Sequence, residues 1–197
     1  MNDQPELWEI PAPQPPNQRL FLAIFPDDHS ARLIHGLAGE MRQMHRLTGA
    51  VRPLSHLHIT LRWINDYVKI PDGTVEDVRR ACEVATARAA PFDITLDRVV
   101  GWGKGTGKHP LVLTGHGDCN DALLEFQHAL WTELIKFGHP GKGGRDFNPH
   151  VTLLYDQCSI PEESVPAISW KVKDIVLVHS EVGVTKYHEL DRWELRG

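Results

Sequence analysis

The chain has 197 residues, 41% of them hydrophobic, which suits one compact domain that buries its core without disulfides. A net charge of −5 argues against a protein that binds along a long nucleic acid, although it allows binding of one terminal nucleotide. The three widely spaced cysteines argue against a disulfide framework or a cysteine zinc site. With no secretion signal and no apolar run of about 18 residues, we expect a cytoplasmic protein without membrane contact.

Residues 1–18 are rich in proline and are expected to form a flexible tail, which leaves 19–197 as a single two-lobed domain. Hydrophobic periodicity and flanking Pro, Gly and Asp residues predict the elements that follow. Strands are expected at 19–25, 57–64, 92–100, 111–114, 150–155, 172–178, 180–184 and 187–195. Helices are expected at 27–47, 73–89 and 118–137. This order predicts an α+β fold with largely antiparallel sheets and helices outside.

A four-residue pattern occurs twice in the chain. His58-Ile59-Thr60-Leu61 returns as His150-Val151-Thr152-Leu153. At the composition of this chain, roughly 0.01 copies of H-[IV]-T-L are expected by chance. Each copy lies on an expected strand, so the repeat predicts two related lobes that face one cleft.

The paired pattern carries a definite chemistry. Side chains alternate along a strand, so each copy points its His and Thr to one face and its aliphatic residues into a core. One imidazole can take a proton from water while the other gives a proton to a departing ribose oxygen. The hydroxyls of Thr60 and Thr152 can donate to phosphate oxygens. This set predicts opening of a cyclic phosphodiester, with no metal and no other cofactor.

Four further residues are candidates for binding the substrate. On a regular strand Arg62 shares the cleft face with the first motif, and Trp63 belongs to the core side. Arg145 lies in a glycine-rich loop before the second motif and can reach a phosphate. Tyr155 and Tyr187 can stack on a base. The alternative for the two arginines is that they are solvated surface charges. The alternative for the two tyrosines is ordinary packing in the core or at its rim.

Two other patterns point to different sites. His56 and His58 have the spacing of metal ligands on one strand face. The sequence nearby lacks the acidic residue and further histidine that a hydrolase centre adds, so no metal site is expected. The glycine-rich run 101–108 looks like a phosphate-binding loop, but it fails G-x-x-x-x-G-K-[ST] and precedes a strand. We expect a hairpin loop there.

The sequence resembles the 2H phosphoesterase superfamily, whose signature is two H-x-T/S motifs, and within it the bacterial 2′-5′ RNA ligase-like RNA 2′,3′-cyclic phosphodiesterases. The likeness runs from residue 19 to about residue 195. It is carried by RLFLAIFP, HLHITLRWI, FNPHVTLLYD and the ending HSEVGVTKYHELDRWEL. The resemblance implies two lobes around a pseudo-twofold axis, with the motif histidines lining the cleft between them.

The resemblance also implies roles. His58 is the expected proton donor and His150 the expected proton acceptor, with Thr60 and Thr152 holding the phosphate. Hydrolysis of an RNA 2′,3′-cyclic phosphate end then leaves a 2′-phosphate, and reversible 2′-5′ ligation is a further possible reaction. The expected partners are RNA ends or cyclic-phosphate nucleotides, bound by a monomer. Two alternatives stay open: a phosphodiesterase for small cyclic nucleotides or a cyclic ADP-ribose phosphate, and a non-catalytic module that binds RNA ends.

Overall fold

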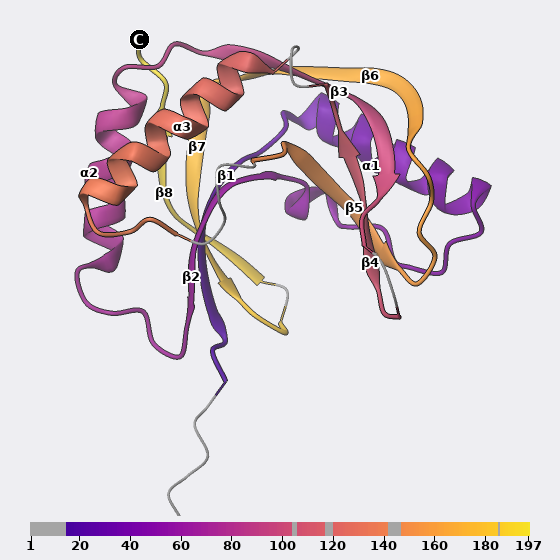
Figure 1. The fold of residues 1–197 in the computed structure, drawn as a ribbon, viewed down its shortest axis with the longest axis horizontal. Helices are drawn as coiled ribbons and strands as arrows, with labels where there is room; N and C mark the ends of the chain where they lie inside the picture. Colours follow the sequence, from indigo (N-terminus) through magenta and orange to yellow (C-terminus); the bar gives the residue numbers. More distant parts are fainter. Residues whose placement is uncertain (1–14, 104–105, 117–119, 142–146, 185) are drawn as a thin grey trace, which may run out of the picture.

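A computed structural model of the protein describes residues 15–103, 106–116, 120–141, 147–184 and 186–197. In these ranges the chain forms one open, eight-stranded antiparallel sheet and three α-helices, which pack on one face of the sheet (Figure 1). The α+β class predicted from the sequence is therefore confirmed.

The strands are β1 (Gln18–Ile24), β2 (Ile59–Tyr67), β3 (Phe92–Gly101), β4 (His109–Thr114), β5 (His150–Asp156), β6 (Glu163–Val172), β7 (Asp174–Glu181) and β8 (Lys186–Glu194). The helices are α1 (Asp28–Met44), α2 (Thr74–Thr86) and α3 (Asp121–Lys136), and a short 3₁₀ turn, η1 (Leu54–His56), leads into β2.

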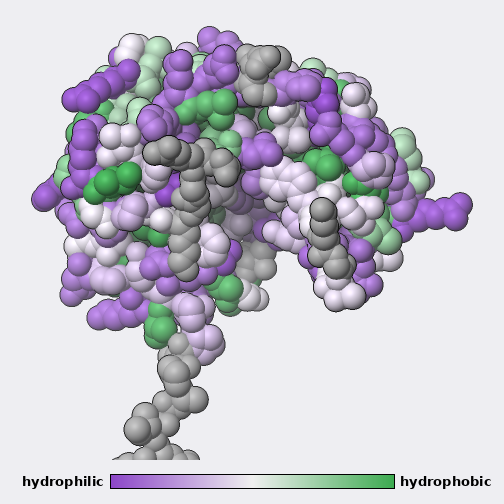
Figure 2. Space-filling view, viewed as in Figure 1, coloured by the Kyte–Doolittle hydropathy of each residue, from purple (hydrophilic) through white to green (hydrophobic). Residues whose placement is uncertain are grey.

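The sheet is divided into two halves at its centre. The strand order is β6-β3-β4-β5-β2-β1-β7-β8, and β2 pairs with β5 only at Ile59 and Val151. Four strands therefore lie on each side of a single residue pair. The two halves form the two predicted lobes, and the molecular surface is hollowed between them (Figure 2).

The helices cover only one face of this sheet. Helix α1 begins at its cap Asp27, whose side chain accepts from the Ser30 N–H at 2.8 Å, and it packs over β5 and β6. Helices α2 and α3 lie together (Figure 1); α2 contacts β8 of the other half, and α3 contacts both β2 and β3. The large hydrophobic core lies between the helices and the sheet. The opposite face carries a small cluster of its own: Phe21, Ala23, Val176 and Val178, with Phe25 and Tyr187 against it.

The structure differs from the predicted elements mainly near the C-terminus. Strand β6 was not predicted, because it contains Pro166 and half of its ten side chains are exposed. Proline is tolerated there because β6 lies at the sheet edge, next to a register shift in its pairing with β3. The two strands expected at 172–178 and 180–184 are instead the single strand β7, followed by a turn.

The predicted tail is partly incorporated into the sheet. Residues 1–14 lie outside the described residues, but β1 already begins at Gln18. The Asn17 N–H donates to the Tyr67 carbonyl at 3.0 Å, and the Asn17 carbonyl accepts from the Val182 N–H at 2.8 Å. The domain therefore begins at least two residues earlier than the sequence suggested.

Candidate active site

The single point of contact between β2 and β5 brings the two H-x-T motifs together. Ile59 and Val151 are partners there, and both are fully buried on the helix side. Alternation then sends the flanking His and Thr of each strand to the opposite face, where all four are half-buried. In an antiparallel register, the residues on either side of a pair lie opposite each other. His58 is thus set beside Thr152, and Thr60 beside His150.

The two imidazoles are held in the same way. Nδ1 of His58 donates to the His56 carbonyl at 2.9 Å, and Nδ1 of His150 donates to the Asn148 carbonyl at 2.8 Å. A carbonyl oxygen can only accept, so these bonds place the proton of the neutral ring on Nδ1. Nε2 of each histidine is left to exchange a proton with a substrate.

The environment of both histidines favours the neutral form. Burial lowers the pKa of His58 to about 4, against the opposing hydrogen bond to the His56 carbonyl, and the charges of Arg52 and His150 add to the decrease. Burial likewise lowers the pKa of His150, opposed by the bond to the Asn148 carbonyl. An anion bound between the two rings would favour protonation of either one.

Aromatic rings flank each histidine. The His58 ring centroid lies 5.1 Å from that of Phe21, 5.6 Å from Tyr187 and 5.7 Å from Phe25. On the other side of the site, Trp102 packs edge-on against His150 with centroids 4.5 Å apart. These rings account for the burial that depresses the histidine pKa values.

Arg52 is a cation at this site that the sequence analysis missed. Its backbone N–H donates to the Leu153 carbonyl of the second motif at 2.8 Å, and its Nη2 donates to the Tyr187 hydroxyl at 3.5 Å. Burial is the main cause that lowers the pKa of His56, and the positive charge of Arg52 lowers it further. Among the described residues, no carboxylate forms an ion pair with Arg52. The cleft therefore holds a half-buried positive charge that no carboxylate in the described ranges neutralises.

The loop that carries Arg52 is fixed by a buried carboxylate. Asp156 at the end of β5 accepts from the N–H groups of Thr48 at 2.6 Å, Gly49 at 2.7 Å and Cys158 at 2.9 Å. The Cys158 bond is the largest of those that hold the pKa of Asp156 well below its usual range. A Cβ on Gly49 would lie 2.1 Å from the Tyr155 carbonyl oxygen, so only glycine permits this approach. These contacts set the position of Arg52.

Arg62 does not share the cleft face, and this part of the prediction is wrong. The pairing of β1 with β2 shifts register after Thr60, and this bulge turns both Leu61 and Arg62 to the helix side. The side chain of Arg62 is 5% exposed; its Nε donates to the Pro140 carbonyl at 2.7 Å, and its guanidinium lies 5.0 Å from the Trp131 ring centre on α3.

The same bulge moves Trp63 to the cleft side instead of the expected core side. The guanidinium of Arg19 lies 4.6 Å from the centre of the Trp63 ring. Arg19 pairs with Ser180, which pairs with Tyr187, so these three side chains share the cleft face.

A matching bulge follows the second motif. The pairing of β4 with β5 shifts register after Thr152, and Leu153 and Leu154 are both buried. Tyr155 consequently turns to the cleft side and is 45% exposed. Burial raises the pKa of Tyr187, and the nearby Tyr155 adds to that rise. The two tyrosines thus both face the cleft, whereas Arg145 lies outside the described residues.

Neither the His56–His58 pair nor the glycine-rich run 101–108 forms the kind of site that its sequence pattern resembles. His56 belongs to η1, and its ring packs edge-on against Tyr187 at a centroid distance of 4.3 Å. The described part of the chain contains no group of three or more His, Cys, Asp or Glu side chains placed to hold a metal ion. The glycine-rich run joins β3 to β4 in a hairpin, as predicted, although residues 104 and 105 lie outside the described ranges.

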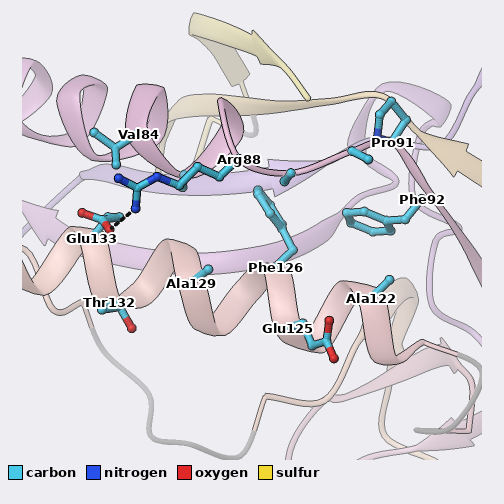
Figure 3. Close-up of a pocket in the computed structure, with 13 residues that line it drawn as sticks. Val84, Arg88, Pro91, Phe92, Ala122, Glu125, Phe126, Ala129, Thr132 and Glu133 are labelled. Atoms are coloured by element: carbon cyan, nitrogen blue, oxygen red, sulfur yellow. Dashed lines mark ion pairs between the residues drawn. The ribbon is translucent and has the colours of Figure 1, made fainter. Parts of the chain in front are cut away.

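A second hollow lies on the helix face, between α2 and α3 (Figure 3). Its volume is about 530 Å³, and its walls include Ala85, Ala89 and Phe126. Arg88 and Glu133 form an ion pair across it at 3.7 Å. The motif residues lie on the opposite face of the sheet, so this hollow is separate from the candidate active site.

An open two-lobed sheet that presents one H-x-T motif from each lobe on a common face is the architecture of a 2H phosphoesterase. The model of the 2′-5′ RNA ligase superfamily matches residues 25–184, and the chain belongs to this family. The resemblance inferred from the sequence is therefore confirmed.

Individual relatives agree with this assignment. The chain is 26% identical over 185 residues to the RNA 2′,3′-cyclic phosphodiesterase of Escherichia coli K12, covering 90% of this chain and 97% of that protein. Its fold is similar to that of TT0787 of Thermus thermophilus, with a TM-score of 0.72, 21% identity, and coverage of 91% and 98%. It is also similar to E. coli LigT complexed with 3′-AMP, with a TM-score of 0.67, 24% identity, and coverage of 92% and 99%. Among the described residues, no helix is long and apolar enough to span a membrane.

Proposed function

We propose that this protein hydrolyses RNA 2′,3′-cyclic phosphate ends to 2′-phosphomonoesters, with His58 and His150 as an acid–base pair that needs no metal ion. The observation that carries the proposal is the Ile59–Val151 pair, which sets both H-x-T motifs on one face. The matched Nδ1 bonds, which leave both Nε2 atoms for proton exchange, support it further.

The proposed reaction is one in-line displacement at phosphorus. Nε2 of His150 takes a proton from water as the water oxygen bonds to phosphorus. The bond from phosphorus to the ribose 3′-oxygen breaks, and Nε2 of protonated His58 gives its proton to that oxygen. The product carries a 2′-phosphate and a free 3′-hydroxyl. The same displacement with an RNA 5′-hydroxyl in place of water forms a 2′-5′ phosphodiester and is the corresponding ligation; its reversal cleaves that bond and restores the cyclic phosphate.

Three groups can stabilise the negative charge that develops on the non-bridging phosphate oxygens during the reaction. Thr60 and Thr152 each supply a hydroxyl donor, and Arg52 supplies a fixed positive charge. The positive charge of Arg52 suits this role because no carboxylate among the described residues pairs with it. Nucleotide substrates fit the family as well, since E. coli LigT has been crystallised with 3′-AMP, ATP and NADP⁺.

One assay tests the activity and its alternatives together. The purified protein is incubated with EDTA and offered RNA ending in a 2′,3′-cyclic phosphate and free 2′,3′-cyclic nucleotides in parallel. We expect hydrolysis of the RNA end to continue in EDTA. Faster turnover of the free nucleotides would favour the small-nucleotide phosphodiesterase, and binding of RNA without turnover would favour the non-catalytic module. Loss of activity in EDTA that zinc restores would favour a metal site at His56 and His58.

The pH dependence should report the depressed histidine pKa values. The active form has one neutral and one protonated histidine, so rate against pH is expected to be bell-shaped. In the free protein, both histidine pKa values lie below the ordinary value of about 6.5. The plot of kcat/KM against pH should therefore have its maximum below pH 6.5. A bound phosphate anion favours the protonated rings, so the bell for kcat should lie at higher pH. Coinciding bells for the two parameters would contradict the proposed electrostatics.

The role of Arg52 can be tested separately. We expect Arg52→Met to lower kcat/KM about 10²-fold, because it removes a positive charge aimed at the reacting phosphate, and Arg52→Lys to lower it less. The same Met variant should raise the pKa of His58, measured by NMR titration. Arg42→Met, at an exposed arginine in the last turn of α1, is the matched control. An unchanged His58 pKa in Arg52→Met would remove Arg52 from the site.

A further inference from the structure

Residues 45–58 form the connection that leads from one half of the sheet into the first motif. They follow α1, which packs on β5 and β6, and they pass through η1 into β2 of the other half. Within the sheet, β2 and β5 pair only at Ile59 and Val151. The position of His58 relative to His150 therefore depends on how this connecting segment is held.

The connecting segment is bound to β5 just after the second motif. The Arg52 N–H donates to the Leu153 carbonyl at 2.8 Å. Oδ2 of Asp156 accepts from the Thr48 and Gly49 N–H groups at 2.6 Å and 2.7 Å, and from the Thr48 hydroxyl at 3.1 Å. The side chain of Asp156 is buried, and hydrogen bonds to a carboxylate are stronger than neutral ones. Asp156 is thus the main attachment of the segment to β5.

The segment approaches β5 as closely as the backbone permits. A Cβ at Gly49 would lie 2.1 Å from the Tyr155 carbonyl oxygen and 3.0 Å from the carbonyl carbon. Any side chain at residue 49 would therefore push the segment away from β5. The contact needs both a carboxylate on β5 and a glycine on the connecting segment.

From this attachment the chain reaches His58 along a short path with few freedoms. Pro53 has a restricted φ, and the His56 N–H closes η1 by donating to the Pro53 carbonyl at 2.9 Å. The His56 carbonyl then accepts from Nδ1 of His58 at 2.9 Å. A shift of the segment would therefore move the His58 imidazole, whereas His150 lies on the same strand as Asp156 and would stay in place.

We propose that Asp156 is a positioning residue for the reaction: it binds the connecting segment to β5 and so holds His58 at its working distance from His150. The proposal rests on the proposed function for the step that the two histidines catalyse. Alternation after Tyr155 turns Asp156 away from the cleft, so Asp156 acts on the substrate only through other residues. Because a misplacement of about 1 Å can cost about 10²-fold in rate, a loosened segment should lower kcat.

Steady-state hydrolysis of a free 2′,3′-cyclic nucleotide measures this positioning. Asp156→Asn keeps the size of the side chain but replaces one accepting oxygen with an NH₂ group, and Gly49→Ala displaces the segment while Asp156 stays intact. Each should lower kcat about 10²-fold. Asn120→Ala is the matched control, because Asn120 is buried in the same half and binds the N–H and the carbonyl of Thr95 at 3.0 Å and 2.9 Å. It should keep kcat at a temperature at which circular dichroism shows all three variants to be folded.

Two combined variants show whether Asp156 acts through His58. In the His58→Ala background, Asp156→Asn should cause little further loss of kcat, because the imidazole that it positions is gone. In the Arg52→Met background, the same change should still lower kcat at least about 10-fold. The reverse pattern would mean that Asp156 acts only through the charge of Arg52, and it would overturn the proposal.

NMR titration of His58 tests the positioning without turnover. In the free protein, Asp156→Asn and Gly49→Ala should each raise the pKa of His58 from about 4 toward its ordinary value, because a displaced ring is more hydrated. Asn120→Ala should leave that pKa unchanged. An unchanged kcat, or an unchanged His58 pKa, in both Asp156→Asn and Gly49→Ala would overturn the proposal. If the wild-type protein hydrolyses no cyclic phosphate but the variants show the pKa shifts, the proposed function fails and the positioning of His58 by Asp156 stands.

Discussion

His58→Ala and His150→Ala are each expected to lower kcat/KM for a 2′,3′-cyclic phosphate end by about 10² to 10⁴, because a positioned acid or base contributes that much to a proton transfer. Thr60→Ala and Thr152→Ala should cost less, since each removes one hydrogen bond to the phosphate. The measurement is steady-state hydrolysis of a labelled cyclic-phosphate RNA by each variant.

The double variant carries the sharper information. If the two histidines act in one step, His58→Ala combined with His150→Ala should be little worse than either single change, because the first change already disables that step. His35→Ala, at an exposed histidine of α1, is the matched control and should retain full activity. Losses that multiply in the double variant would mean that the two imidazoles serve separate steps.

A substrate with an activated leaving group should distinguish donor from acceptor. A phosphodiester that releases nitrophenolate needs little protonation of its leaving oxygen, so it bypasses the acid and not the base. We expect it to reduce the defect of His58→Ala about 10²-fold while leaving that of His150→Ala unchanged. Initial rates on the activated and ordinary substrates give the ratio directly.

The pKa of His58 gives this experiment its importance. Burial lowers that pKa to about 4 in the free protein, so a donor role requires the bound phosphate to hold the proton on His58. Selective rescue of His150→Ala would reverse the two roles. Equal rescue of both variants would leave neither histidine as a dedicated donor.

Strand alternation predicted the centre of the site from the sequence because the four motif positions lie before any irregularity. The two bulges begin directly after Thr60 and Thr152, and alternation fails from there. Arg62 was assigned to the cleft and lies on the helix side, whereas Tyr155 reaches the cleft only because of its bulge. A bulge depends on how neighbouring strands pair, and no residue type in either motif indicates that one follows.

Arg52 shows a second limit of the sequence. It lies in a loop without a motif, and its place depends on Asp156, whose carboxylate binds the loop from 107 and 108 residues away along the chain. Strand β6 escaped prediction for a similar reason, because Pro166 is acceptable only at a sheet edge. Long-range contacts decide both features, and local patterns do not contain them.

The proposed joint action of His58 and His150 opens a 2′,3′-cyclic phosphate toward the 2′ side. It is tested most directly by ³¹P NMR of the product that the protein forms from a cyclic-phosphate RNA in EDTA. We expect a single 2′-phosphate resonance from the wild-type protein and almost none in the same time from His58→Ala or His150→Ala. A 3′-phosphate product, or an undiminished 2′-phosphate signal from either variant, would contradict it.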